Sequence, residues 1–332
     1  MHTPYWAVIT ITWVIVGASF AADPFVVYEG GDGPGAGKHV VLISGDDEYR
    51  SEESMPQLAK ILSEHHGFTC TMLWAINPDT GAIDPATLNN IPGLEALEDA
   101  DLMVLFLRFR ELPDDQMKRI MAYTNSGRPI VALRTSTHPF FYQVDKENPY
   151  AKWSFNSQDP KGGYGREILG ETWISHYGHH NVQSTRGHVA PGIEDNPLVR
   201  GCEDIWGPSD VYGVTTLSGD STPVIMGEVL TGMNPDDGPA ADKKRVPIAW
   251  TKSYTGTSGN PSRVFTTTMG HSFDLKSEGF RRLLVNAVYW GVELEDQIPA
   301  RANVDFVGEY DPSDIGFGTH KKGVMPEAHA LK

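Results

Sequence analysis

Short apolar runs alternate with amphipathic segments over the first half of this sequence, and this alternation restricts the fold. Residues 39–44 (HVVLIS) and 102–107 (LMVLFL) form apolar runs of the kind found in strands that are covered on both faces. Apolar residues then recur at helical spacing over 55–62 and 117–124. Strand and helix in alternation predict an α/β fold in which right-handed crossovers join the strands of a doubly wound, mostly parallel sheet.

The rest of the chain divides into one long domain and shorter flanking segments. We expect residues 38–296 to form the α/β domain. Within it, 139–222 is rich in Gly, Pro and aromatic residues and has weak periodicity, which predicts a loop-rich insert over the carboxyl ends of the strands. Residues 22–37 are glycine-rich and are expected to form a flexible leader, whereas 297–332 are expected to form an extended tail. Further strands are predicted at 68–74, 129–133, 224–229, 246–250 and 264–269, and a last helix from Ser277 onward.

The first 21 residues have the features of a secretory signal peptide. Residues 5–18 are apolar and uncharged, and the small residues Ser19 and Ala21 that follow fit cleavage after Ala21. An uncleaved anchor is the alternative, but the apolar run is short for a membrane span. We therefore expect a protein that is exported to the periplasm or secreted, with no membrane association after cleavage.

Charge and cysteine content exclude several classes of function. The 332 residues include 43 Asp and Glu against 27 Lys and Arg, a formal charge of -16, and no Lys/Arg-rich run offsets it. Such a surface repels phosphate backbones, so neither nucleic acid nor an anionic membrane is expected as a partner. With only Cys70 and Cys202, the chain can form neither a disulfide framework nor a cysteine-rich zinc site.

Polar side chains follow four of the predicted strands at the points where the strands end. Ligands of doubly wound sheets bind at that edge, so we expect these side chains to share one site. His271, His138 and Glu48 are the candidate proton-transfer residues. The candidate substrate-binding residues are Arg108, Arg110, Arg134, Ser136, His180 and Tyr212. The alternative for Glu48 is a surface pair with Arg50, and for Arg108 and Arg110 ion pairs with Glu111 and Asp114.

Zinc binding and covalent acyl-enzyme chemistry are two further types of chemistry that these segments bear on. The histidine-rich run 176–181 could supply zinc ligands, with His138, His180 and His271 as the set, although loop histidines also serve as hydrogen-bond donors to backbone. Covalent acyl-enzyme chemistry is disfavoured, because Arg134 stands where a nucleophile would follow the fourth strand and no Gly-x-Ser-x-Gly motif surrounds Ser136.

The segment 260–293 (NPSRVFTTTMGHSFDLKSEGFRRLLVNAVYWGVE) contains a strand, a Gly-His-Ser turn and a helix in succession. It resembles the closing signature of ThuA-like (trehalose-utilisation) proteins, in the exported branch of planctomycete type, and is the most specific of the similar segments. The opening segment 39–62 is also similar, as are LRFRELPDDQM, VALRTSTHPF, HYGHHN and NPLVRG in the middle. The resemblance implies a flavodoxin-like fold of the class I glutamine-amidotransferase type and a role in the metabolism of trehalose or 3-keto-disaccharides.

The resemblance also implies which residues are functional. In amidotransferases of this fold a catalytic His follows the last strand, a position that His271 matches, and a Cys occupies the position that Arg134 holds here, so amidotransferase activity is not expected. The sequence thus predicts an enzyme acting on a small carbohydrate by His and carboxylate acid–base chemistry. A non-catalytic sugar-binding module is the alternative, and a zinc-dependent hydrolase is the third reading. Whether the chain forms a homo-oligomer is left open.

Overall fold

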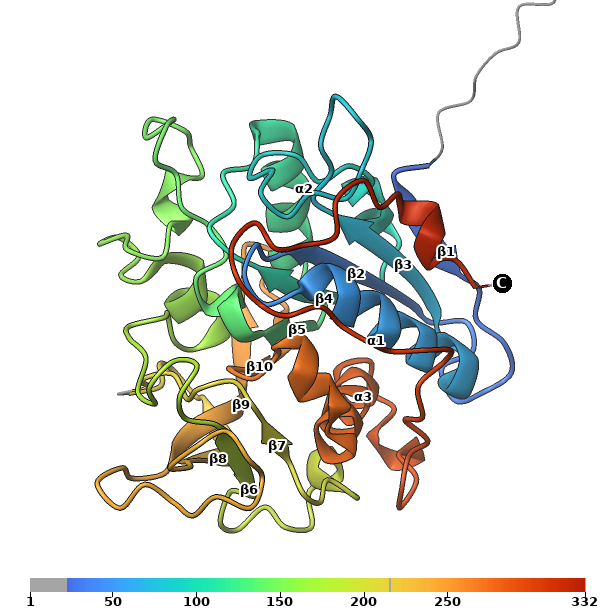
Figure 1. Ribbon diagram of the computed structural model, residues 1–332. Coiled ribbons are helices and arrows are strands. Elements are labelled where there is room, and N and C mark those ends of the chain that lie inside the picture. The colour runs from blue at the N-terminus through green and yellow to red at the C-terminus, as the bar shows by residue number, and fades with distance from the viewer. Residues whose placement is uncertain (1–22, 215, 332) are drawn as a thin grey trace, which may run out of the picture.

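The computed structural model describes residues 23–214 and 216–331, which form one twisted sheet with helices on both faces (Figure 1). The sheet has ten strands in the order β1-β3-β2-β4-β5-β10-β9-β8-β6-β7. A mixed α/β fold is therefore confirmed. The predicted signal peptide, residues 1–21, lies outside the described residues. Within the described part of the chain, no helix has both the length and the apolar character needed to cross a membrane.

Five parallel strands form the core of the sheet, and the strands at both edges are antiparallel. The core strands are β2 (His39–Gly45), β3 (Thr69–Trp74), β4 (Leu102–Leu107), β5 (Ile130–Leu133) and β10 (Pro261–Thr267). The edge strands are β1 (Phe25–Tyr28) beside β3, and β9 (Val246–Thr255), β8 (Thr222–Val229), β6 (Thr185–Val189) and β7 (Trp206–Gly207) beyond β10. All residues of β4 are buried, as its continuously apolar sequence requires.

Three helices cover the two faces of the parallel core. Helices α1 (Ser51–His66) and α3 (Glu278–Gly291) pack on one face, and α2 (Asp114–Thr124) packs on the other. Alternate residues of β4 divide between the two cores: Val104 and Phe106 lie with α1 and α3, whereas Leu105 lies with α2. The shorter helices are Leu94–Glu98, Arg134–Thr137, Ala151–Trp153, Gly165–Leu169, Pro197–Val199, Ser272–Lys276, Glu295–Gln297 and Pro326–His329.

The prediction for the leader needs correction. Residues 22–37 are not simply a flexible leader, because β1 pairs with β3 and buries Val26 and Tyr28, apolar residues that alternate along the strand. The loop-rich insert predicted at 139–222 contains short strands: β6 and β7 lie within it and extend the sheet. Four of the five residues of β6 are only half-buried, so its sequence lacks the apolar run of a core strand.

The C-terminal tail carries no strand in its described part and runs along α1, where it is red in Figure 1. Its apolar side chains, among them Ile315 and Val324, pack against the core on the α1 face. Cys70 and Cys202 are both buried and unpaired, so neither forms a disulfide.

Candidate functional site

The loops that follow β2, β5 and β10 are tied to one another at the carboxyl ends of these strands. The hydroxyl of Thr135 donates to Oδ2 of Asp46 (2.6 Å), and the backbone N–H of Arg134 donates to the carbonyl of Met269 (3.2 Å). The other oxygen of Asp46 accepts from the N–H groups of Glu48 (2.8 Å) and Tyr49. These contacts fix the backbone that carries Glu48, as a preorganised site requires.

Arg134 occupies a strained position at the end of β5 and is fully buried. Its φ of 44° is in the left-handed region, where a residue with a side chain is uncommon. Its guanidinium lies between the rings of Tyr49 (4.5 Å) and Tyr212 (4.0 Å) and donates to Oδ1 of Asp210 (2.8 Å). Arg134 therefore holds these side chains in place and does not itself line the neighbouring cavity, described below, so it is not placed to bind substrate as predicted.

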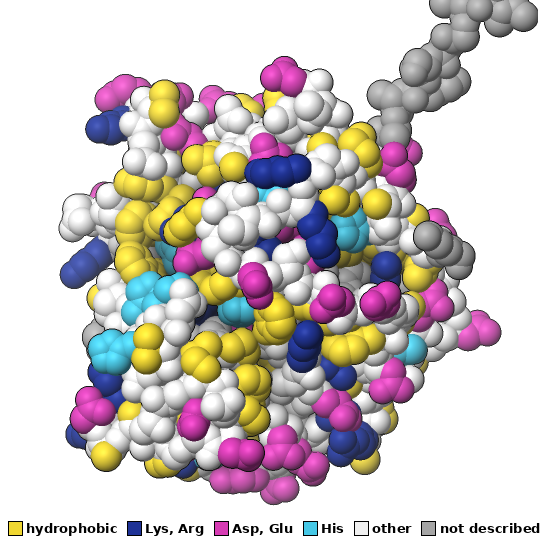
Figure 2. All heavy atoms as spheres, viewed as in Figure 1, with side chains coloured by type: hydrophobic (Ala, Val, Ile, Leu, Met, Phe, Trp, Pro, Cys, Tyr) yellow, Lys and Arg dark blue, Asp and Glu magenta, His cyan; other side chains and the backbone are white. Residues whose placement is uncertain are grey.

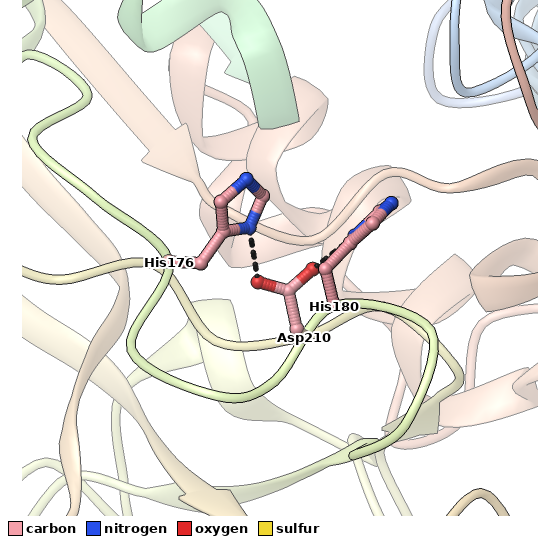
Figure 3. A group of neighbouring side chains, drawn as sticks. All are labelled: His176, His180 and Asp210. Carbon is pink, nitrogen blue, oxygen red and sulfur yellow. Dashed lines mark hydrogen bonds and ion pairs between the residues drawn. The ribbon is translucent and has the colours of Figure 1, made fainter.

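Asp210 connects Arg134 to two histidines. The Nδ1 atom of His176 lies 2.6 Å from its Oδ2, and Nδ1 of His180 lies 3.0 Å from its Oδ1 (Figure 3). Although burial opposes ionisation, Arg134 and the two imidazoles hold the pKa of Asp210 well below its ordinary value. An ionised carboxylate only accepts hydrogen bonds, so both histidines present Nδ1–H to it. Nε2 of His176 then carries the ring's lone pair, whereas Nε2 of His180 faces Glu48.

A cavity of about 250 Å³ opens beside this group, and side chains from several loops line it. The lining residues are Glu48, Tyr49, Arg108, Phe109, His138, Trp173, His176, Tyr212 and Phe317. Figure 2 shows that histidine and hydrophobic side chains reach the surface together on this face of the molecule. Aromatic side chains beside a few polar groups are typical of small-molecule sites.

Glu48 is the carboxylate that lines this cavity. Burial, together with the negative charge of Asp46, raises its pKa above the ordinary value for glutamate. Nε of Arg108 lies 3.4 Å from its Oε2, and Nε2 of His180 lies 3.5 Å from its Oε1. Since His180 also contacts Asp210, a continuous polar chain connects Glu48 to His176.

The two predicted proton-transfer histidines are placed differently from each other. His138 lines the cavity, where its ring lies 5.4 Å from that of Trp173; burial and the charges of Arg108 and Arg134 lower its pKa well below the ordinary value. His271 lies behind Tyr49, and its Nδ1 accepts from the N–H of Phe273 at 2.9 Å. Burial lowers the pKa of His271 to about 3, so its ring is neutral near pH 7.

Four of the six predicted substrate-binding residues do not line the cavity: Arg134 and His180, described above, and Ser136 and Arg110. The hydroxyl of Ser136 donates to the carbonyl of Leu105 (2.8 Å) and accepts from the N–H of Leu107 (3.1 Å), so it stabilises the end of β4. Arg110 is fully buried and donates to the backbone carbonyls of Pro85 and Thr87 (both 2.9 Å). Backbone groups therefore bind both side chains away from the cavity, and the structure gives no support for the substrate-binding role predicted for them.

Among the described residues, the side chains spaced to hold a metal ion are His176, His180 and Asp210, with ligand atoms within 4.8 Å of one another. This set differs from the predicted His138, His180 and His271. A cation there would have to replace the Nδ1–H donors and lie next to the Arg134 guanidinium, which is 2.8 Å from the same carboxylate. The repulsion between two positive charges disfavours metal binding.

Sequence reasoning missed three important parts of the site. His176 lies in the histidine-rich run 176–181, but His180 is the residue of that run predicted to bind substrate. Asp210 lies 30 residues from the nearer histidine and has no motif around it. Phe317 lies in the tail, where only the Gly-Phe-Gly sequence hinted at an unusual backbone.

No family model matches the chain, and no curated protein matches it. Among solved structures, the chain is similar to a protein described as ThuA-like from Parabacteroides merdae (16% identity, TM-score 0.49), with 77% of this chain and 90% of that one covered. A second protein described as ThuA-like, from Bacteroides uniformis, has 13% identity and a TM-score of 0.47, with 80% and 95% covered. The mmIFT52 N-terminal domain is also similar (11%, TM-score 0.38; 76% and 96% covered).

The family that the sequence resembles is thus also the family named for two of these solved structures. Likeness at such low identity concerns the fold alone.

Proposed function

We propose that this protein is a ThuA-like enzyme that acts on a small carbohydrate, trehalose or an oxidised disaccharide such as a 3-keto form, by acid–base chemistry without a covalent enzyme intermediate. One observation carries the proposal: Glu48 and His176 line the same aromatic cavity. The surroundings of each group suit it to proton transfer. Burial raises the pKa of Glu48, and the Asp210 carboxylate binds Nδ1 of His176.

The two groups divide the proton transfer between them. His176, with Nδ1–H donated to Asp210, accepts a proton at Nε2, and Asp210 stabilises the imidazolium that forms. Glu48, whose pKa is raised, holds a proton at higher pH than an ordinary glutamate and can deliver it to a ligand oxygen. Arg108, half-buried at the cavity wall, donates hydrogen bonds to hydroxyls or to a developing oxyanion. Hydrolysis, isomerisation and elimination all use such a pair of groups.

The lining of the cavity favours a neutral, polyhydroxylated ligand. Trp173 and Tyr212 offer ring faces, and Glu48 and His176 offer hydrogen bonds. An anionic ligand such as a phosphate ester is disfavoured, since Arg108, the guanidinium of the cavity lining, already pairs with Asp47 at 3.0 Å.

The test is a thermal-shift panel with glucose, trehalose, sucrose, their 3-keto forms and divalent metals, followed by product analysis with each sugar that stabilises the protein. A ligand at 100 times its Kd adds about 2.7 kcal/mol of stability. Glu48→Gln and His176→Asn should retain binding and lose turnover, whereas Val144→Ala, in an exposed loop outside the cavity, should retain both. Stabilisation without turnover in the wild type would instead support the sugar-binding module. Stabilisation by a metal alone would support the zinc hydrolase through His176, His180 and Asp210.

Two finer expectations belong to the same proposal. We propose that the parallel core is of the flavodoxin-like, class I amidotransferase type, which the strand order β3-β2-β4-β5-β10 supports. We also propose export through residues 1–21, which determination of the N-terminal residue of the protein recovered from outside the cytoplasm would test.

A further inference from the structure

A short segment of the C-terminal tail, residues 313–320, carries Phe317 to the cavity; we call it the strap. Ser313 anchors one end, where its N–H and hydroxyl donate to the carboxylate of Glu53 on α1 (2.7 and 2.6 Å). At the other end His320 is buried, and its Nε2 lies 3.3 Å from Oδ1 of Asp84. Both anchors lie outside the cavity, so the strap is positioned independently of any ligand.

The middle of the strap is bound to the loop that carries Glu48. The N–H of Gly316 donates to the carbonyl of Glu48 (2.9 Å), and Nη2 of Arg50 donates to the carbonyl of Gly316 (2.7 Å). Figure 1 shows this part of the tail, in red, beside the connection between β2 and α1. The strap therefore has a fixed place relative to the proposed proton donor.

This attachment presents Phe317 at the cavity. Gly316 (φ 130°) and Gly318 (φ 71°) flank it, and both adopt backbone conformations that side chains disfavour. The phenyl ring is 61% exposed, yet it lines the cavity, with the guanidinium of Arg108 4.9 Å from its centre. Arg108 in turn lies 4.5 Å from the ring of Phe109, so it separates an inner aromatic ring from an outer one.

The cavity is small, and its size determines where a second sugar ring would lie relative to Phe317. About 250 Å³ is smaller than the roughly 300–1,000 Å³ of ordinary ligand pockets, and one ring of a sugar fills much of it. A ligand with two rings must place its second ring at the mouth, where Phe317 is exposed for stacking. We propose, on the basis of the proposed function, that Phe317 forms an outer subsite for the second ring and makes the site selective for two-ring over one-ring carbohydrates.

Calorimetric titration of trehalose, its 3-keto form and glucose into wild type, Phe317→Ala and Phe317→Trp tests this inference. Stacking of an aromatic ring contributes about 0.5–1.5 kcal/mol. Phe317→Ala should therefore weaken disaccharide binding roughly 2- to 13-fold and leave glucose binding unchanged, while Phe317→Trp should bind the disaccharide as the wild type does. Val144→Ala, which also shortens an exposed apolar side chain, is the matched control and should change neither affinity.

A second variant tests the strap without altering the cavity. Ser313→Ala removes one hydrogen bond to Glu53 and should weaken the disaccharide by a smaller factor than Phe317→Ala, again sparing glucose. Equal weakening of both sugars by Phe317→Ala, or no weakening of either, would overturn the outer subsite and leave the proposed function standing. If no carbohydrate binds even the wild type, the proposed function is wrong and the subsite is overturned with it.

Discussion

Nδ1 of His176 lies 2.6 Å from Oδ2 of Asp210, so a carboxylate fixes the tautomer of an exposed imidazole at the cavity. Asn at position 210 would offer an amide that can donate to Nδ1 and leave the proton on Nε2, where the base is needed. We expect Asp210→Asn to lower turnover of a stabilising carbohydrate roughly 10²- to 10⁴-fold, measured as kcat/KM.

The matched control is another imidazole–carboxylate pair. His188 and Glu228 interact at 3.2 Å on the paired strands β6 and β8, outside the cavity. Glu228→Gln should leave kcat/KM within about twofold of wild type. Similar losses in both variants would show that the effect of Asp210→Asn is not specific to the site.

Removal of the Asp210 side chain should also destabilise the fold, because Arg134 is fully buried and would lose its counter-charge. Breaking one side of a buried ion pair costs about 3–5 kcal/mol. Asp210→Ala should lower the free energy of unfolding in urea by that amount. Glu98→Ala, which breaks the exposed pair with Arg119, should cost less than about 1 kcal/mol, and equal costs would contradict the supporting role of Arg134.

Substitution of Ser136 tests whether this residue stabilises the fold or binds the ligand. Because its hydroxyl bridges the carbonyl of Leu105 and the N–H of Leu107, Ser136→Ala should lower the free energy of unfolding by about 1–3 kcal/mol. The affinity of the folded variant for the carbohydrate, measured by calorimetric titration, should be unchanged. A loss of affinity without a loss of stability would restore the substrate-binding interpretation.

The parallel core was predictable because its strands are buried on both faces, so runs such as 102–107 carry an unbroken apolar signal. Edge strands carry no such signal: β6 is half-buried and polar, and β1 lies in a glycine-rich context. Placement of Glu48, Arg108 and His138 at one cavity followed from the rule that strand ends converge.

The remaining site residues depend on long-range geometry that no local pattern encodes. Asp210 belongs to the candidate site because the Arg134 guanidinium and two imidazoles converge on it, and those contacts span 30 to 76 positions of sequence. Ser136 and Arg110 were assigned to the ligand because polar residues at a strand end look alike in sequence, whether backbone carbonyls satisfy them or not. Phe317 reaches the cavity through a tail without periodicity.

A buried histidine far from the cavity should control the acid sensitivity of the fold. His66, at the end of α1, contacts the hydroxyl of Tyr289 (2.9 Å) and the carbonyl of Asn303 (2.7 Å), and burial lowers its pKa from 6.5 to about 4. The unfolded chain therefore binds the proton more readily than the folded one. This residue's contribution to stability is full above pH 6.5 and is lost as the pH falls toward 4.

Replacement of this histidine by a residue that does not titrate should remove that loss. Between pH 7 and 4 the wild type should lose about 3 kcal/mol more stability than His66→Gln, a difference that urea unfolding at several pH values measures. Other titrating groups, including His271 and Glu52, are present in both proteins and cancel in the comparison. Parallel pH profiles for wild type and His66→Gln would show that His66 is not held neutral in the folded protein.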